Sequence, residues 1–438
     1  GQETAAVQVR VQRADGVDEV GVRLYSPLQK KRKLLYINGK TAARTGELMG
    51  HVTCVMFSPE DLDIVRGAPQ GRRRFVDMLL REALGLIRGK LCEALRALGD
   101  FALKTKDVPC VGLTHLQAAQ PLTVGRRAAC WAQDLLQDLT DLDALLPSIK
   151  LLGCRGATGT QASFLDLFDG DVDKVEAMEQ AISQKLGGLP VFDVSGQTYP
   201  RKLDARVLNL LASLGISCYR FAQDVRLLQS RGEMEEPFGS SQIGSSAMAY
   251  TRNPIRAERA CSLSRHLIAL SQDAAMTACT QWCERTLDDS ANRRIALPEA
   301  FLTADAVLDI VIYLARGLVV YPKMCERGLR DALPFIATEN IMMEAVKKGG
   351  DRQSTHERIR AHAQAAAVRM KEEGTANDLL QRIVEDPSLP LTQEELSTLL
   401  EPSKYIGLAP RQTERFVTRV LRPAIGQDGC ADAGNVVL

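Results

Sequence analysis

The spacing of hydrophobic and polar positions along the chain changes near residues 75–85. Before this point, apolar and polar residues alternate in the runs around Val9 and Val22. A period of two predicts strands with one buried face. The dipeptides Asp15–Gly16 and Asn38–Gly39 are turn signals that would join such strands into hairpins. The pattern therefore predicts a short β-rich segment at the start of the chain.

Beyond this point, apolar residues recur every three or four positions, which is the period of an amphipathic helix. The clearest stripe runs from Val207 to Leu228 and covers about six helical turns. Long helices, few strands and only 5% aromatic residues together predict a mainly α fold built as a helical bundle. Similar stripes cover roughly residues 75–105, 122–147, 257–284 and 301–320.

Short polar segments separate the predicted helices, and those at 112–121, 153–161 and 232–254 are the most prominent. Such segments are often functional loops. From about residue 321 the helices shorten and the charge density rises. We therefore predict three parts of the chain, namely a β-rich segment at 1–78, a central helical-bundle domain at 79–320 and a small helical domain at 321–438.

Composition and charge narrow the class of protein. The 438 residues are 45% hydrophobic and 25% charged, which is an ordinary composition for a globular protein. The formal net charge of +1 argues against a protein that mainly coats nucleic acid or an anionic membrane. The most apolar stretch, 307–321, contains Asp309 and Arg316 and is too short to span a bilayer. The eleven cysteines lack the spacing of a zinc site, so we predict no metal. They also lack the spacing of a dense disulfide framework, which predicts a reducing compartment such as the cytoplasm.

One segment carries a specific motif. Residues 239–259 read GSSQIGSSAMAYTRNPIRAER. This run resembles the signature of the fumarase/aspartase superfamily, GSSxMPxKxNP, and in particular the form GSSAMPYKRNPxRxE of the adenylosuccinate lyase family. The resemblance covers about residues 79–438 and continues in the runs GTQASF at 159–164, SGQTY at 195–199, EMEEPF at 233–238 and ERTLDDSANRR at 284–294.

The resemblance implies a fold and a reaction. In this superfamily, long helices of four identical subunits form one core bundle, and each active site draws on several subunits. The family's reaction is a β-elimination that releases fumarate from adenylosuccinate, giving AMP, and from the succinylated carboxamide intermediate of purine synthesis. It implies neither a metal nor an organic cofactor. The predicted partners are therefore a small-molecule substrate and further copies of this chain.

Such an elimination needs a base for the proton beside a carboxylate, an acid for the leaving nitrogen, and cations for the anionic groups. By its place in the signature, Ser245 matches the family's catalytic base. His115, in the run THLQ at 114–117, matches its general acid. The positions that match the family's substrate-binding residues are Gln197, Arg259, Arg285, Ser290 and Arg294, with Thr160 and Ser163 as further hydrogen-bonding candidates.

Two departures from the family pattern bear on activity. Thr251 stands at the position of the signature lysine, and Ala249 at that of the signature proline; a threonine supplies no positive charge. Residues 1–78 also lack the family's Arg-Tyr, His-Asp and Thr-Ser motifs. They resemble instead part of the RecF family of DNA-repair ATPases, in the runs FSPEDLDIVRG at 57–67 and RRRF at 72–75, although the phosphate loop GxxxxGK[ST] of that family is absent.

The sequence leaves several functions open. The first is a lyase of the adenylosuccinate type with reduced activity. The alternatives are a lyase-like scaffold that assembles without catalysis, a DNA-repair accessory protein led by the N-terminal segment, and a sister enzyme that acts on argininosuccinate, aspartate or malate. The neutral charge and missing phosphate loop argue against the DNA-binding class. The EMEEPF and ERTLDDSANRR runs favour the purine branch.

Overall fold

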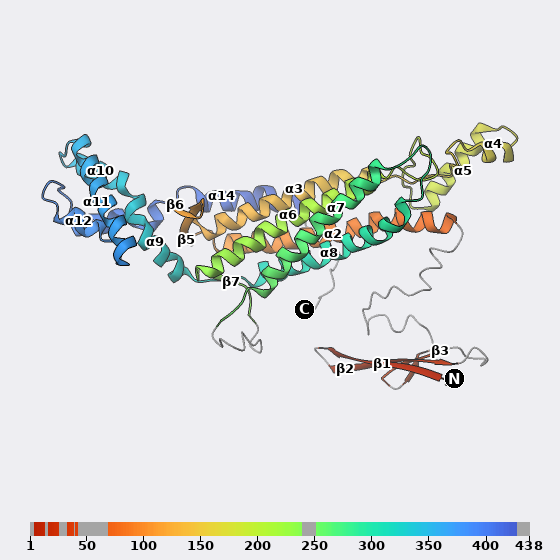
Figure 1. The fold of residues 1–438 in the computed structure, drawn as a ribbon, viewed down its shortest axis with the longest axis horizontal. Helices are drawn as coiled ribbons and strands as arrows, with labels where there is room; N and C mark the ends of the chain where they lie inside the picture. The colour runs from red at the N-terminus through yellow and green to blue at the C-terminus, as the bar shows by residue number, and fades with distance from the viewer. Residues whose placement is uncertain are drawn as a thin grey trace. The chain divides into compact units, whose positions relative to one another are not determined.

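The computed structural model describes residues 4–13, 16–25, 33–38, 40–42, 69–238 and 251–426 (Figure 1). The chain forms two compact units, residues 1–72 and residues 73–438. Among the described residues, no helix combines the length and apolar character that a bilayer crossing requires.

The first unit is an antiparallel sheet in the order β1-β2-β3-β4. Val9 in β1 lies opposite Val20 in β2, and Ile37 in β3 lies opposite Lys40 in β4, with Asn38 between them at φ 49°. These pairings confirm the hairpins that the alternating pattern predicted. The strands are β1 (Thr4–Arg13), β2 (Gly16–Tyr25), β3 (Lys33–Ile37) and β4 (Lys40–Ala42).

The second unit is built on long helices that lie side by side (Figure 1). All eight apolar positions of the predicted stripe on α6 are buried, namely Val207, Leu208, Leu211, Leu214, Cys218, Phe221, Val225 and Leu228. In the same core, the rings of Trp131 and Phe221 meet edge to face with their centroids 5.2 Å apart. The mainly α bundle is thus confirmed. Its helices are α2 (Pro69–Lys104), α3 (Val124–Leu145), α6 (Lys202–Ser230), α7 (Ile255–Cys279) and α8 (Asp289–Gly317).

A β-hairpin interrupts the helices where the sequence predicts only a polar break. Strand β5 (Pro109–Thr114) pairs with β6 (Gln117–Thr123). A Cβ atom at Gly112 would lie 2.2 Å from the carbonyl oxygen of Gln120, so only glycine fits where the register shifts. A second small sheet pairs β7 (Met234–Glu235) with β8 (Val319–Val320).

Shorter elements extend from both ends of the bundle (Figure 1). From one end project α4 (Ala162–Leu167) and α5 (Val172–Lys185), which follow the 3-10 turn η2 (Leu146–Ser148). The remaining elements are α9 (Pro322–Ile336), α10 (Thr338–Lys347), α11 (Arg352–Glu373), α12 (Leu379–Glu385), α13 (Gln393–Leu399), η3 (Pro402–Lys404), α14 (Ala409–Phe416), η4 (Val417–Leu421) and α15 (Arg422–Ile425).

The segment predicted as one domain at 321–438 contributes to two apolar cores. Residues between Ala337 and Leu396 form a core of their own. Val417, Leu421 and Ile425 instead join the core of the long bundle. The chain therefore leaves the bundle, builds a small helical body and returns, a division that the sequence pattern does not predict.

Candidate active site

The predicted site residues lie at two opposite ends of the bundle. The loop end comprises residues 151–201 and 280–294, where α7 ends and α6 and α8 begin. The hairpin end comprises the β5–β6 hairpin and residues 231–238 and 251–259, where α7 begins. Gln197, Arg285, Ser290, Arg294, Thr160 and Ser163 belong to the loop end, and His115 and Arg259 to the hairpin end.

Helix length separates the two groups. Arg259 lies near the start of α7, which runs on to Cys279 before the chain reaches Arg285. Twenty residues of α-helix span about 30 Å. Within one chain, the side chain of Arg259 therefore cannot meet an anion that Arg285 binds.

His115 lies at the exposed tip of the β5–β6 hairpin. His115 and its neighbour Leu116 have φ values of 54° and 56°, a left-handed pair that forms the turn. The base of the hairpin is anchored, because Arg127 Nη2 on α3 donates to the Val111 carbonyl at 2.8 Å. Cys110 beside it is fully buried, and burial raises the pKa of its thiol to about 11. The arrangement presents the imidazole to solvent from a fixed base.

Ser245 lies outside the described residues. The EMEEPF run at 233–238 precedes its segment, and this run contacts the start of α7, which follows the segment. The buried carboxylate of Glu236 accepts the backbone N–H groups of Arg256, at 3.1 Å, and of Ala257, at 3.0 Å. It thereby binds the positive N-terminal end of α7. Burial raises the pKa of Glu236 above its usual value, although these two donors act in the opposite direction. Glu236, just before the signature run, is therefore bonded to residues 256 and 257 near the end of that run.

Thr251 is half-buried in the position of the signature lysine. The neighbouring cation, Arg252, is turned to other partners. Its Nη1 lies 3.1 Å from an oxygen of Glu235, and its guanidinium stacks 5.3 Å from the centre of the Phe238 ring. The guanidinium of Arg252 is therefore already engaged by Glu235 and Phe238.

Glycines bring three segments of the loop end into close contact. A Cβ atom at Gly159 would lie 1.9 Å from the carbonyl oxygen of Ser195, and one at Gly196 would lie 2.6 Å from that of Glu284. The backbone N–H of Gln197 donates to the same Glu284 carbonyl at 3.2 Å. These contacts place the chain around Thr160, Gln197 and Arg285 in one cluster.

Arg285 is held by a buried carboxylate. Its Nη1 donates to both oxygens of Asp289, at 2.8 and 3.0 Å, and Nε of Arg201 donates to the same group. Burial raises the pKa of Asp289, but the Arg201 and Arg285 guanidiniums lower it by more, so its net pKa lies below the usual value. Asp289 is therefore ionised between two cations at neutral pH.

A second set of charges adjoins this one. The ring of Tyr199 lies 4.7 Å from the Arg201 guanidinium and 5.4 Å from that of Arg293. The Tyr199 hydroxyl donates to Asp204 at 2.6 Å, and Arg293 pairs with the same carboxylate. Together the two sets hold three guanidiniums, of Arg201, Arg285 and Arg293, against the carboxylates of Asp204 and Asp289, an excess of one positive charge.

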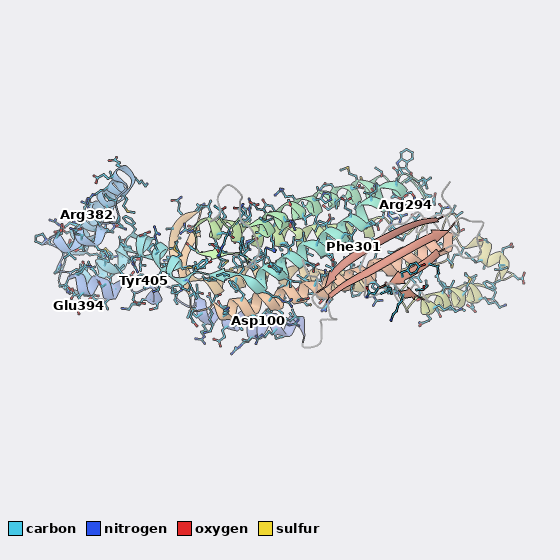
Figure 2. All side chains as sticks on the ribbon, turned by 90° about the horizontal axis from the view of Figure 1, so that it is seen from below. Asp100, Arg294, Phe301, Arg382, Glu394 and Tyr405 are labelled. Carbon is cyan, nitrogen blue, oxygen red and sulfur yellow. The ribbon has the colours of Figure 1, made fainter. Side chains whose placement is uncertain are left out.

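The cluster of three arginines and two aspartates at the loop end has a net charge of +1 and is therefore suited to anions. Gln197, Arg285 and Ser290 are half-buried, whereas Thr160, Ser163 and Arg294 are exposed. Figure 2 labels Arg294 near the end of the bundle where α8 begins. Within the described ranges, no three His, Cys, Asp or Glu side chains are placed to hold a metal ion together.

Sequence reasoning missed the residues that orient this cluster, Asp289, Arg201 and Arg293. The only signal for Asp289 is its position between two arginines in the ERTLDDSANRR run. Arg201 and Arg293 have ordinary charged-residue positions in the sequence, and charged residues are usually solvated.

Comparison with known proteins first defines the class. Residues 76–268 match the family model described as "Lyase". The structure is similar to 3-carboxy-cis,cis-muconate lactonizing enzyme from Pseudomonas putida, with a TM-score of 0.67 and 25% identity over 81% of this chain and 79% of that one. It has the same fold as a fumarate lyase from Mesorhizobium, with a TM-score of 0.66 and 22% identity over 82% of this chain and 84% of the other. The chain is a helical-bundle lyase of the fumarase/aspartase superfamily.

Two further matches define the family. Residues 334–416 match the model "Adenylosuccinate lyase C-terminus". Adenylosuccinate lyase of Saccharomyces cerevisiae is 50% identical over 348 residues, which are 80% of this chain and 72% of the yeast protein. The chain belongs to the adenylosuccinate lyase family. These matches give no support to a RecF relation for residues 1–78, which stays a prediction.

Proposed function

We propose that the chain catalyses the β-elimination of fumarate from adenylosuccinate, which yields AMP, and from the succinylated carboxamide intermediate of purine synthesis. The observation that carries this proposal is the 50% identity to a named adenylosuccinate lyase across 348 residues. The net positive charge of the cluster formed by Arg201, Arg285, Arg293, Asp204 and Asp289 supports it, because the substrate carries carboxylates and a phosphate that bind arginine well.

In this proposal, Ser245 removes the proton beside a substrate carboxylate and His115 protonates the leaving nitrogen. Arg259, Arg285 and Arg294 bind anionic groups. Gln197, Ser290, Thr160 and Ser163 supply hydrogen bonds. The guanidiniums act most strongly on the charge that develops after the proton is lost, and such preorganised contacts accelerate the step.

The separation of these residues leads us to propose a homotetramer with shared sites. His115 and Arg259 of one copy would then meet Arg285 and its neighbours from another. Exposed apolar side chains on the long helices support such an assembly, since Leu86 on α2 is 69% exposed, Ile216 on α6 59% and Ile295 on α8 64%. Apolar groups left in solvent along a bundle are suited to a second copy of the same surface.

The chain is expected to be slower than a complete family member. Thr251 lacks the signature cation, and the loss of one preorganised electrostatic contact costs on the order of 10²–10³ in rate. Residues 1–78 also lack three family motifs. We further propose a reducing compartment, the cytoplasm, because the nine cysteines that the structure describes are all free thiols.

The test is single-turnover release of fumarate from adenylosuccinate by the parent, by Thr251→Lys, by Ser245→Ala and by the double variant. The lysine should raise the rate, mainly through kcat, because it stabilises the developing charge more than the ground state. Ser245→Ala should abolish release in both backgrounds. An equal gain from the lysine with and without Ser245 would contradict these roles, since it would then act on binding alone.

The same experiment separates the alternative functions. Silence of both the parent and Thr251→Lys, in a chain that still assembles, would favour the non-catalytic scaffold. No described residue or match favours a DNA-repair role. Tight binding of a DNA duplex with a steep salt dependence would be the evidence for such a role.

A further inference from the structure

Asp289 is the first residue of α8, and its side chain is fully buried, with 0% of its surface exposed. Both of its oxygens face guanidiniums, since Arg285 donates to each of them and Arg201 donates to one. Among the described residues Asp289 is thus enclosed by charge partners. A buried carboxylate cannot contact a substrate, so any effect on the reaction must pass through its partners.

Arg285 is the more accessible partner, with 24% of its side-chain surface exposed against 6% for Arg201. Its backbone lies in the short connection between α7 and α8, where its N–H donates to the Trp282 carbonyl at 3.1 Å. A long side chain on such a connection has many rotamers, and ordering them when an anion binds weakens the affinity. A guanidinium that is already held by two hydrogen bonds avoids most of that loss. Its remaining N–H donors stay available for an anion.

Arg201 prevents the carboxylate from cancelling the charge of Arg285. Arg201 is buried, lies over the Tyr199 ring and shares Asp289. Two cations around one anion leave the set with one positive charge. The carboxylate can therefore orient Arg285 without neutralising the site.

We propose that Asp289 is a positioning residue that holds the guanidinium of Arg285 in the orientation that receives an anionic group of the substrate. The proposal rests on the proposed function, which assigns Arg285 to substrate binding. It adds a role for a residue that has no contact with substrate.

The test is the Kd of adenylosuccinate for the full chain, measured by titration calorimetry in a Ser245→Ala background that prevents turnover. Arg285→Ala should weaken binding by about 10- to 100-fold, the usual range for a hydrogen-bonded charge. Asp289→Asn should weaken it by about tenfold, because the amide presents N–H groups to a guanidinium. In the Arg285→Ala background, Asp289→Asn should have no further effect on Kd, since the side chain that it orients is gone.

Asp204→Asn is the matched control. Asp204 is equally buried and also holds two partners, Tyr199 and Arg293, but neither is assigned to substrate binding. Its replacement should lower the melting temperature and leave Kd within about twofold, because it removes no hydrogen bond to Arg285. If Asp289→Asn does not fold, Asp289→Glu keeps the charge and moves the carboxylate by one methylene, and it should fold and still bind more weakly.

The outcomes separate the two proposals. A normal Kd for Asp289→Asn or Asp289→Glu, together with weak binding by Arg285→Ala, would overturn the positioning role and leave the proposed function intact. Additive losses in the double variant, or an equal loss from Asp204→Asn, would reduce Asp289 to a structural residue and overturn the proposal. A normal Kd for Arg285→Ala, or no binding by the Ser245→Ala chain, would count against the proposed site itself and remove both.

Discussion

Replacing Asp138 by asparagine should stabilise the bundle at neutral pH. Asp138 lies on α3 with 3% of its surface exposed. Ser213 Oγ donates to its Oδ1 at 2.7 Å, whereas Oδ2 has no hydrogen-bond partner among the described residues. Burial raises the pKa of this carboxyl from 3.8 to about 6, although hydrogen bonds from Ser213 and Ser217 oppose the shift. The folded protein therefore favours the protonated form.

The size of the effect follows from the two pKa values. At a pH between the unfolded pKa near 3.8 and the folded pKa of about 6, the native state binds more protons than the unfolded chain. The contribution of Asp138 to the free energy of unfolding is therefore complete below pH 3.8 and is lost as the pH rises through 6. A difference of about two units corresponds to roughly 3 kcal/mol. Asparagine is neutral at every pH and its carbonyl can accept from Ser213. Its amide needs an acceptor, so we expect a net gain of about 1–2 kcal/mol at neutral pH.

The assay is urea unfolding followed by far-UV circular dichroism at about pH 5 and about pH 7.5, between which the parent should lose roughly 1.4 kcal/mol more than Asp138→Asn. Asp143→Asn is the control, because Asp143 lies on the same helix with its side chain 41% exposed in an ion pair with Arg88. Such surface pairs contribute about 0–1 kcal/mol. An Asp138→Asn variant that is less stable than the parent by the same amount at both pH values would refute the reasoning.

Three further results are expected. Gly196→Ala should destabilise the chain by about 1–3 kcal/mol and weaken adenylosuccinate binding, because the new Cβ would lie 2.6 Å from the carbonyl oxygen of Glu284. The control is Gly85→Ala, where nothing lies within 4 Å of the new Cβ, and thermal melts should show it to be neutral or stabilising. Hydrogen bonds from Ser388 and His362 hold the pKa of Asp386 well below its usual value, so Asp386→Asn should destabilise the small helical body at neutral pH, with a penalty that shrinks as the pH falls below about 4. Light scattering should give a tetramer at micromolar concentration, and a monomer would contradict the shared sites.

The period of apolar residues predicted the bundle because burial repeats along a helix over many turns. On α6, each of the eight stripe positions between Val207 and Leu228 is buried. Few secondary structures other than a long helix can bury residues with this spacing. The β5–β6 hairpin escaped prediction because neither strand alternates cleanly between buried and exposed positions. Strand β5 has three consecutive buried residues, and β6 contains Pro121, a residue that argues against a strand. The return of Val417 and Leu421 to the bundle core is a contact between distant segments that local period cannot encode.

The candidate site shows the same limit. The resemblance assigned Arg285 to substrate binding, and the structure shows how Gly196 and Gln197 bring a second segment against the neighbouring Glu284. The resemblance could not assign a role to Asp289, because the sequence alone does not distinguish an aspartate among arginines from an ordinary solvated charge. Only burial distinguishes a carboxylate that orients a guanidinium from one that faces water.

In the proposed tetramer, the division of the proposed site residues between two ends of the bundle constrains how the copies pack. His115 and Arg285 of one chain lie at opposite ends of the bundle, whose helix α7 has 25 residues and is about 37 Å long. A two-fold axis across the bundle would place the hairpin end of one copy against the loop end of the next, and would do so twice for each pair. Every copy would then contribute to more than one site. A substitution at either end would consequently damage a site that its own chain only partly builds, so mixing an inactive hairpin-end variant with an inactive loop-end variant should restore some activity that neither has alone.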